Sequence, residues 1–193
     1  IAYPSNGADL KGLLKAAYYD PNPVVILEHK GLYWSKVKGT DAARVNEPSE
    51  DYLLPFGKAN IVQEIWEQET AETLTVITYG MGVHWALNAS TTIKNQVEII
   101  DLRTLFPLDE ETVLKSVKKA KKCLIVTEEP TNNSFARSLA GLIQEKCFTY
   151  LDAPVMVIGS ENMPAIPLNS TLEQTMIPST EKVKVKIEEL LSY

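Results

Sequence analysis

The sequence has few cysteines and no long apolar run, and these absences exclude several classes of protein. Only Cys123 and Cys147 occur among 193 residues, too few for a disulfide framework or a cysteine-rich zinc site. No apolar run approaches the ~18 residues that span a bilayer, and the first residues do not resemble a signal peptide. The formal net charge of −6 argues against a nucleic-acid groove. We therefore expect a cytoplasmic protein that binds neither nucleic acid nor membranes.

Several sequence motifs of catalytic and cofactor sites are also missing. There is no glycine-rich phosphate loop, no Gly-x-Ser-x-Gly nucleophile elbow and no His-Glu-x-x-His zinc motif. Gly80-Met81-Gly82 begins like a dinucleotide-binding fingerprint, but Trp85 stands where the third glycine belongs. Its indole would hold helix and strand apart. We therefore predict an ordinary strand-to-helix turn at this point.

The composition and the apolar pattern predict an α/β protein with a mostly parallel sheet flanked by helices. Hydrophobic residues make up 45% and charged residues 23%, as in globular domains. Short β-branched runs alternate with amphipathic helical stretches, which indicates parallel strands joined by helices. The predicted strands are 1–4, 24–28, 57–62, 74–79, 96–101, 123–127 and 154–158, and the predicted helices are 8–19, 83–93, 110–121, 134–147 and 180–191.

The predicted elements divide into a partial domain, a linker and a complete domain. Two strands and one helix at the start cannot bury their own faces, and residue 1 is isoleucine rather than a start methionine. We therefore expect residues 1–35 to be the end of a sheet whose other strands precede residue 1. The apolar periodicity disappears over residues 36–53, which we interpret as a polar linker. Residues 54–193 contain the second α/β unit.

The two histidines are the first candidates for chemistry. His29 and Glu28 end a predicted strand, and the carboxyl ends of parallel strands are where open sheets bind ligands. The alternative, which we favour, is a polar strand end in solvent or paired with Lys30. His84 lies early in a predicted helix, where a capping or packing role is the simpler interpretation.

Three other groups of residues allow two interpretations each. Glu128 and Glu129 end a strand and could shift one another's pKa, although a solvated pair is the simpler state. The lysines of 115–122 form either an anion patch or the solvated face of a helix, and the overall acidity favours the latter. Four aromatic residues near the first unit belong either to a subunit interface or to the core, and the sequence does not decide between them: Tyr18, Tyr19, Tyr33 and Trp34.

The turn after the first helix carries a small cluster of oxygen ligands. Asp20 and Asn22 lie in a proline-containing turn with free backbone carbonyls. Such a loop suits a hard cation that prefers oxygen ligands. Asx residues are also common in ordinary turns that end helices, so the pattern alone does not distinguish the two.

Runs along almost the whole chain resemble the β subunit of the thiamin-diphosphate-dependent 2-oxo acid dehydrogenases. The runs occur in the order and at the spacing of that family. They are Tyr3-Pro4-Ser5, Lys11–Ala17 (Lys-Gly-Leu-Leu-Lys-Ala-Ala), Asp20–Val25 (Asp-Pro-Asn-Pro-Val-Val), Leu27-Glu28-His29-Lys30, Leu54–Ala59 (Leu-Pro-Phe-Gly-Lys-Ala), Thr75–Gly80 (Thr-Val-Ile-Thr-Tyr-Gly), Ile100–Asp109 (Ile-Asp-Leu-Arg-Thr-Leu-Phe-Pro-Leu-Asp), Tyr150–Pro154 (Tyr-Leu-Asp-Ala-Pro) and Ile177-Pro178-Ser179.

This resemblance implies a fold and a function. Residues 1–35 would end a pyrimidine-binding domain, and residues 54–193 would form a transketolase-like C-terminal domain. The family decarboxylates a 2-oxo acid such as pyruvate or a branched-chain 2-oxo acid on thiamin diphosphate and passes the acyl group to a lipoyl acyltransferase. The family's activating glutamate, its Gln-His-Ser histidine and its Mg²⁺- and diphosphate-binding motif lie outside this chain. We therefore assign no catalytic or cofactor-binding residue here and expect the chain alone to be inactive.

The resemblance also implies a cation site and partners. Some members hold K⁺ at the turn that matches Ala17, Asp20 and Asn22. The partners would be the α part of the same enzyme, a second β copy forming a dimer, and the peripheral subunit-binding domain of the acyltransferase. The positions that match the acyltransferase contact are Asp152 and the terminal carboxylate of Tyr193, which suit a basic partner surface.

Two alternatives remain beside this interpretation. The chain could be the C-terminal part of a transketolase or deoxyxylulose-phosphate synthase, which shares the fold but has no acyltransferase partner. The runs at 27–30 and 150–154 favour the dehydrogenase. It could also be a non-catalytic α/β assembly module, since fold alone does not determine function. The incomplete first sheet argues against such a module.

Overall fold

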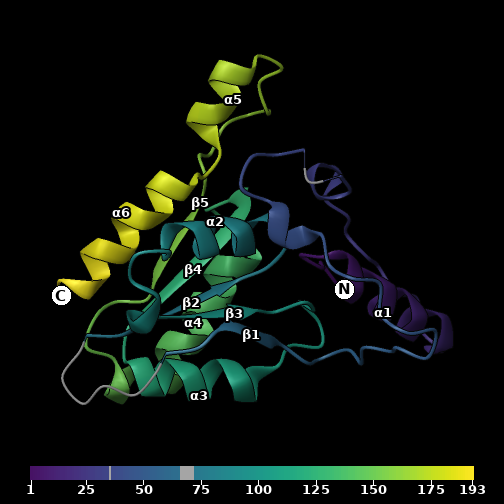
Figure 1. Ribbon diagram of the computed structural model, residues 1–193. Helices are drawn as coiled ribbons and strands as arrows, with labels where there is room; N and C mark the ends of the chain where they lie inside the picture. Colours follow the sequence, from purple (N-terminus) through teal and green to yellow (C-terminus); the bar gives the residue numbers. More distant parts are fainter. Residues whose placement is uncertain (35, 66–71) are drawn as a thin grey trace.

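The computed structural model describes residues 1–34, 36–65 and 72–193 and is built around one five-stranded sheet (Figure 1). The strand order is β1-β3-β2-β4-β5, with β1 antiparallel to β3 and the other neighbours parallel. The mostly parallel α/β sheet predicted from the sequence is therefore confirmed. The strands are β1 (Asn60–Gln63), β2 (Leu74–Thr78), β3 (Val97–Asp101), β4 (Cys123–Pro130) and β5 (Met156–Ser160).

Helices cover both faces of this sheet. The two described cores lie on opposite faces: one contains Trp85 of α2 and Ile187 of α6, and the other contains Val117 of α3 and Ile143 of α4. Strands β2 and β3 are buried along their whole length and β4 is buried over residues 123–127, as expected of mainly apolar strands covered on both faces. The α-helices are α1 (Gly7–Tyr19), α2 (Met81–Ala89), α3 (Glu110–Ala120), α4 (Phe135–Cys147), α5 (Ser170–Met176) and α6 (Thr180–Leu191), and the short 3₁₀ helices are η1 (Lys30–Leu32), η2 (Asp41–Ala43), η3 (Lys94–Gln96) and η4 (Phe148–Tyr150).

The N-terminal segment differs from the prediction. Residues 1–4 and 24–28 are predicted as strands, but the structure has only a parallel bridge between Ala2 and Ile26 and an antiparallel one between Ala2 and Thr104. Pro4 has no N–H with which to continue a ladder. Residues 2–3 nevertheless lie between the chain near residue 25 and the chain near residue 103. Ala2 N donates to Val25 O at 2.9 Å, and Tyr3 N donates to Arg103 O at 2.8 Å.

The turn between β2 and α2 is an ordinary strand-to-helix turn, as predicted. Gly80 has φ +55°, a left-handed conformation that favours glycine, and α2 starts at the next residue, two before the predicted start. A Cβ on Gly80 would lie 2.6 Å from the ring of Tyr3. A Cβ on Gly82 would collide with the Thr78 hydroxyl and lie 3.2 Å from Val126 O. Both glycines therefore allow close packing at the carboxyl end of β2.

Candidate functional site

The chain's own N-terminal segment fills the crevice where an open α/β sheet usually binds ligands. The chain passes from central β2 to β3 on one side and then to β4 on the other, so the connections diverge at the carboxyl ends of these strands. Such a switch point is the usual ligand site of the fold. Here Ser5 contacts Asp101 at the end of β3, and Tyr3 contacts Glu128 in β4. The crevice thus joins residues 1–34 to the domain that follows.

A buried cluster of charged groups makes the strongest part of this junction. Arg103 donates from Nε and Nη2 to the two carboxylate oxygens of Asp9, both at 2.8 Å, and the Asp9 side chain is only 3% exposed. Ser5 Oγ donates to Asp101 Oδ2 at 2.5 Å, and Arg103 N donates to Asp101 Oδ1 at 3.0 Å. Burial raises the pKa of Asp101 to about 7, although the hydrogen bonds from Ser5 and Arg103 oppose this.

His84 is a buried packing residue, in agreement with the simpler interpretation of the sequence. Its side chain lies in α2, and Nε2 is 2.8 Å from Ser5 O. A carbonyl oxygen only accepts, so Nε2 carries the proton. Burial lowers the pKa of His84, and the ring is therefore neutral at pH 7.

His29 does not lie free at a strand end, nor does it pair with Lys30, so the favoured interpretation of this residue is wrong. Its Nε2 is 3.3 Å from Glu128 Oε1, and the other carboxylate oxygen accepts a 3.4 Å hydrogen bond from Tyr3 OH. The hydrogen bond to Glu128 raises the pKa of His29 above its ordinary value of 6.5, while burial opposes the shift. His29 and Glu128 thus form a partly buried pair across the junction.

The interpretation of Glu128 and Glu129 as a solvated pair is also wrong. Glu129 accepts from Tyr79 OH at 2.7 Å and from the backbone N of Ala136 at 3.1 Å, at the start of α4. Tyr79 OH is also 2.8 Å from Thr127 Oγ1. The two carboxylates therefore have different partners on the two sides of β4, and both act as structural acceptors.

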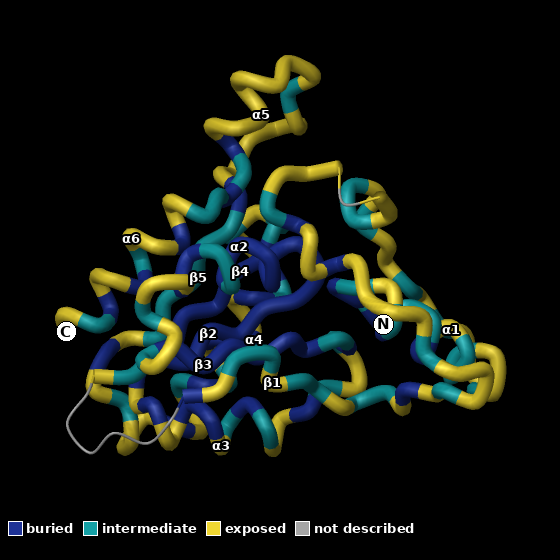
Figure 2. Tube along the Cα trace, in the orientation of Figure 1, coloured by how far each residue is buried: buried dark blue, intermediate teal, exposed yellow. Residues whose placement is uncertain are grey.

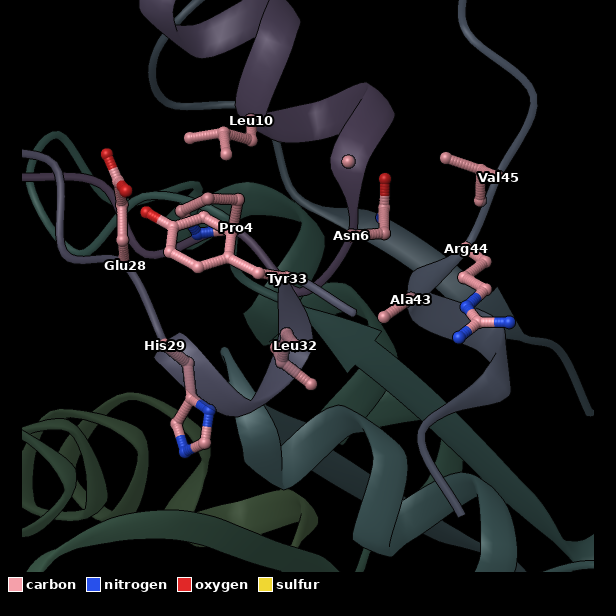
Figure 3. Close-up of a pocket in the computed structure, with 11 residues that line it drawn as sticks. Pro4, Asn6, Leu10, Glu28, His29, Leu32, Tyr33, Ala43, Arg44 and Val45 are labelled. Atoms are coloured by element: carbon pink, nitrogen blue, oxygen red, sulfur yellow. The ribbon is translucent and has the colours of Figure 1, made fainter. Parts of the chain in front are cut away.

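A cavity of about 280 Å³ lies beside this junction (Figure 3). Glu28 and His29 both line it, as the cleft interpretation supposes, but their side chains point in opposite directions, and His29 is turned toward its Glu128 partner. The volume falls just below the ~300–1,000 Å³ of typical ligand pockets. Its lining residues come from α1, η1 and η2 and from the residues directly beside these helices: Pro4, Asn6, Gly7, Leu10, Glu28, His29, Leu32, Tyr33, Ala43, Arg44 and Val45.

The structure brings the three predicted cation ligands into one turn. Asp20 N donates to Ala17 O at 3.3 Å, and Asp20 Oδ1 accepts from the backbone N and side-chain Nδ2 of Asn22 at 2.8 and 3.0 Å. These hydrogen bonds stabilise the conformation of the turn. A K⁺ ion bound through Asp20 Oδ1 would have to replace the bonds from Asn22.

The two predicted docking residues are Asp152, which follows η4, and Tyr193, which follows α6. Asp152 N donates to Lys121 O at 2.9 Å, and its half-exposed carboxylate lies 3.9 Å from Lys121 Nζ. Lys122 Nζ reaches Leu191 O at 3.4 Å, two residues before Tyr193, whose side chain is exposed. The turn at 121–122 therefore contacts Asp152 and the end of α6, close in sequence to Tyr193.

The lysines of 115–122 are not simply a solvated helix face. Lys122 is almost fully buried, and its Nζ lies 2.6 Å from Glu72 Oε2. Lys119 pairs at 3.1 Å with Glu98, a buried residue of β3. Lys119 and Lys122 thus form ion pairs within the domain. Their charges are therefore not free to bind an anion, which weakens the anion-patch alternative.

A sequence model of the family "Transketolase, C-terminal domain" matches residues 59–183. This chain belongs to that family. The matched residues include the whole sheet. A solved structure described as "Split gene transketolase, inactive beta4 tetramer" has the same fold, with a TM-score of 0.70 at 18% identity over 99% of this chain and 57% of that one.

This member of the transketolase C-terminal domain family is also similar, along almost its whole length, to the β subunits of several oxidoreductases. It is 37% identical over 196 residues to 2-oxoisovalerate dehydrogenase subunit beta of Bacillus subtilis, covering 100% of this chain and 56% of that protein. It is 36% identical to pyruvate dehydrogenase E1 component subunit beta of Rhizobium meliloti (95% and 37% covered). It is 34% identical to acetoin:2,6-dichlorophenolindophenol oxidoreductase subunit beta of Cupriavidus necator (95% and 51%). The chain thus spans about half the length of these relatives or less.

The described part of this transketolase C-terminal domain chain has no group of three His, Cys, Asp or Glu side chains placed to hold a metal ion. The residues at the carboxyl edge of the sheet already bind one another, so they do not fit a Mg²⁺–diphosphate group. Within the same described residues, no helix combines the length and apolar character needed to cross a membrane.

Proposed function

We propose that this chain is the C-terminal part of the decarboxylating, acyl-transferring component of a 2-oxo acid dehydrogenase complex, an oxidoreductase of the cytoplasm. The observation that carries the proposal is the similarity of almost the whole chain to β subunits of a 2-oxoisovalerate dehydrogenase and a pyruvate dehydrogenase. In the intact enzyme thiamin diphosphate with Mg²⁺ supplies the electron sink for decarboxylation. The residues that bind it lie outside this chain.

The role of this part is assembly rather than chemistry. A crevice filled by Tyr3 and Ser5 leaves no ligand site at the switch point, which supports an assembly role. The partners are the α part of the enzyme, a second β copy and the peripheral subunit-binding domain of the lipoyl acyltransferase. We assign Asp152 and Tyr193 to the last of these. The contacts of the turn at 121–122 with Asp152 and with Leu191, two residues before Tyr193, support one docking surface.

Calorimetry with an isolated peripheral domain tests the docking surface. We expect binding to the chain, a loss of about tenfold or more for Asp152→Ala, and a similar loss when Tyr193 is removed. Asp41→Ala, which removes an exposed carboxylate of η2, is the matched control and leaves affinity unchanged. Unchanged affinity in both test variants contradicts the docking assignment.

A second titration tests whether the chain needs the rest of the enzyme. The chain alone is expected to give no saturable heat with thiamin diphosphate and Mg²⁺. Micromolar binding would contradict the proposal that the cofactor-binding residues lie elsewhere. It would favour an independent cofactor-binding protein instead.

We also propose that the turn at Ala17, Asp20 and Asn22 binds K⁺ in the intact enzyme. The grouping of these residues in one turn supports this, because it places several oxygen atoms, the ligands that hard cations prefer, close together. The midpoint of thermal unfolding is then higher in KCl than in NaCl at equal ionic strength, and Asp20→Ala removes the difference. Equal midpoints in the two salts for the intact wild-type enzyme contradict the site.

A further inference from the structure

The segment 161–177, which we call the arm, projects from the body of the molecule and carries α5 (Figures 1 and 2). Met176 at its base is buried, but four other apolar side chains are largely exposed: Met163, Ile166 and Leu172 are 54–63% exposed and Leu168 is fully exposed. Single exposed apolar residues are common, but a group of them on one projecting segment marks an interaction surface. The arm therefore needs a partner surface.

Hydrogen bonds at its base and within it give the arm a defined shape. Glu161 N donates to Met176 O at 3.0 Å, which closes the two ends of the segment on one another. Lys182 Nζ of α6 donates to Thr175 O and Ile177 O at 2.9 and 2.8 Å, and the Asn169 side chain caps α5. An arm ordered before binding loses less entropy when it binds.

A second exposed apolar group lies in the segment after η1, and we call it the linker turn: Trp34, Lys36, Val37 and Lys38. Trp34 is 63% exposed, so the core interpretation of this aromatic residue is wrong, and Lys36 Nζ lies 4.8 Å from its ring centroid. The linker turn is near the base of the arm. The pKa of Glu181, in the first turn of α6, is lowered by hydrogen bonds from its own backbone and from Ser179 and by the charge of Lys38.

The charges of these two surfaces are opposite. The arm contains Glu161 and Glu173, both exposed, and no lysine or arginine. The linker turn contains two exposed lysines and no acidic residue. Within one chain, no ion pair among the described residues joins the arm to the linker turn. One face of the molecule thus presents an acidic apolar surface beside a basic apolar one.

We propose that the arm of one copy of this chain binds the linker turn of a second copy, in a two-fold dimer with two such contacts. A two-fold interface requires a self-complementary face, on which residue i meets j and j meets i. An acidic and a basic apolar surface side by side satisfy that requirement. The inference rests on the proposed function, in which β copies pair, and deepens it by naming the surface through which they do so.

The first experiment measures the dimer dissociation constant of the 193-residue chain by sedimentation equilibrium. Glu161→Lys with Glu173→Lys makes the arm basic, and Lys36→Glu with Lys38→Glu makes the linker turn acidic. Each double variant places like charges at both contacts and is expected to raise the dissociation constant roughly tenfold or more. Glu111→Lys with Glu145→Lys, on α3 and α4 at the opposite face of the sheet, is the matched control and leaves it unchanged.

The second experiment mixes the two double variants. A basic arm then meets an acidic linker turn at one contact, and an acidic arm meets a basic linker turn at the other. The mixture is therefore expected to dimerise with nearly the wild-type constant, although neither component does so alone. All substituted side chains are exposed, so the thermal midpoints of the variants should stay close to that of the wild type.

Several outcomes would overturn the proposal. A chain that stays monomeric at millimolar concentration has no such dimer, and a dimer insensitive to both double variants forms elsewhere. Double variants that dissociate but do not complement each other indicate that the arm and the linker turn each contact a different part of the second copy. Each of these results leaves peripheral-domain binding at Asp152 untouched, so failure of this inference is distinguishable from failure of the proposed function.

Discussion

Replacing Arg103 by methionine tests how strongly the N-terminal segment is held to the sheet. The substitution removes both hydrogen bonds to Asp9 and keeps most of the side-chain volume. Arg103 has φ +58°, but neither residue is glycine, so the backbone strain is similar before and after the change. The measured difference therefore reports the ion pair.

The expected loss follows from what remains after the change. The Asp9 carboxylate, 3% exposed, keeps the hydrogen bond from Asn6 Nδ2 at 2.8 Å but loses its only described ion-pair partner. Breaking a buried pair by removing one partner costs about 3–5 kcal/mol. That is a large fraction of the ~5–15 kcal/mol by which native domains are stable.

Urea unfolding followed by circular dichroism measures the change in the free energy of unfolding. Arg137→Met, at an exposed arginine of α4, is the control and should change it by less than about 0.5 kcal/mol. Arg103→Met combined with Asp9→Leu should recover part of the loss, because an apolar pair leaves no buried charge. A loss below about 1 kcal/mol for Arg103→Met would refute the reasoning.

Three further predictions concern packing and pH. Gly82→Ala should cost about 1–3 kcal/mol in urea unfolding, because its Cβ meets the Thr78 hydroxyl, whereas Gly141→Ala, with open space around it in α4, should gain about 0.5–1 kcal/mol. His29→Gln should destabilise most below pH 6.5 and least once the pH has risen through the raised pKa of His29, since its pairing with a carboxylate requires the protonated ring. Asp101→Asn should abolish a fall in wild-type stability between about pH 4 and 7, because the folded state there holds a proton that the unfolded state has released.

These predictions have distinct contrary outcomes. Equal effects of alanine at Gly82 and Gly141 would show that the crowding at the end of β2 relaxes freely. A His29→Gln effect that grows with pH has the wrong sign for a charged pair. A pH slope that persists in Asp101→Asn, measured by urea unfolding at several pH values, assigns the proton to another group.

The sheet could be predicted because its central strands are buried on both faces. Val76, Ile99 and Ile125 lie in apolar runs, bounded by turns, that are too short for helices, and this pattern is typical of parallel strands. Ser134 and Asp109 cap helices near the positions where the sequence predicts their starts. The seven-residue α5 was not predicted, because an exposed helix needs no apolar stripe to bury.

The contacts of the junction could not be predicted from one sequence. Asp9 and Arg103 are separated by 94 residues, and His29 and Glu128 by 99. Each residue alone matches a common local role, such as an acidic group in the first turn of a helix for Asp9. Only the fold decides which distant charges meet, since charge pairing has no sequence period.

Residues 2–6 can be regarded as a peptide ligand that the domain carries on its own chain. They lie at the switch point and are held through Ser5 by Asp101 and His84, as a bound substrate would be. Covalent attachment keeps such a ligand at millimolar or higher effective concentration, so a free competitor displaces it only with difficulty. A change that loosens this segment would therefore do two things at once, detaching the N-terminal unit and exposing a binding crevice that the fold otherwise keeps closed.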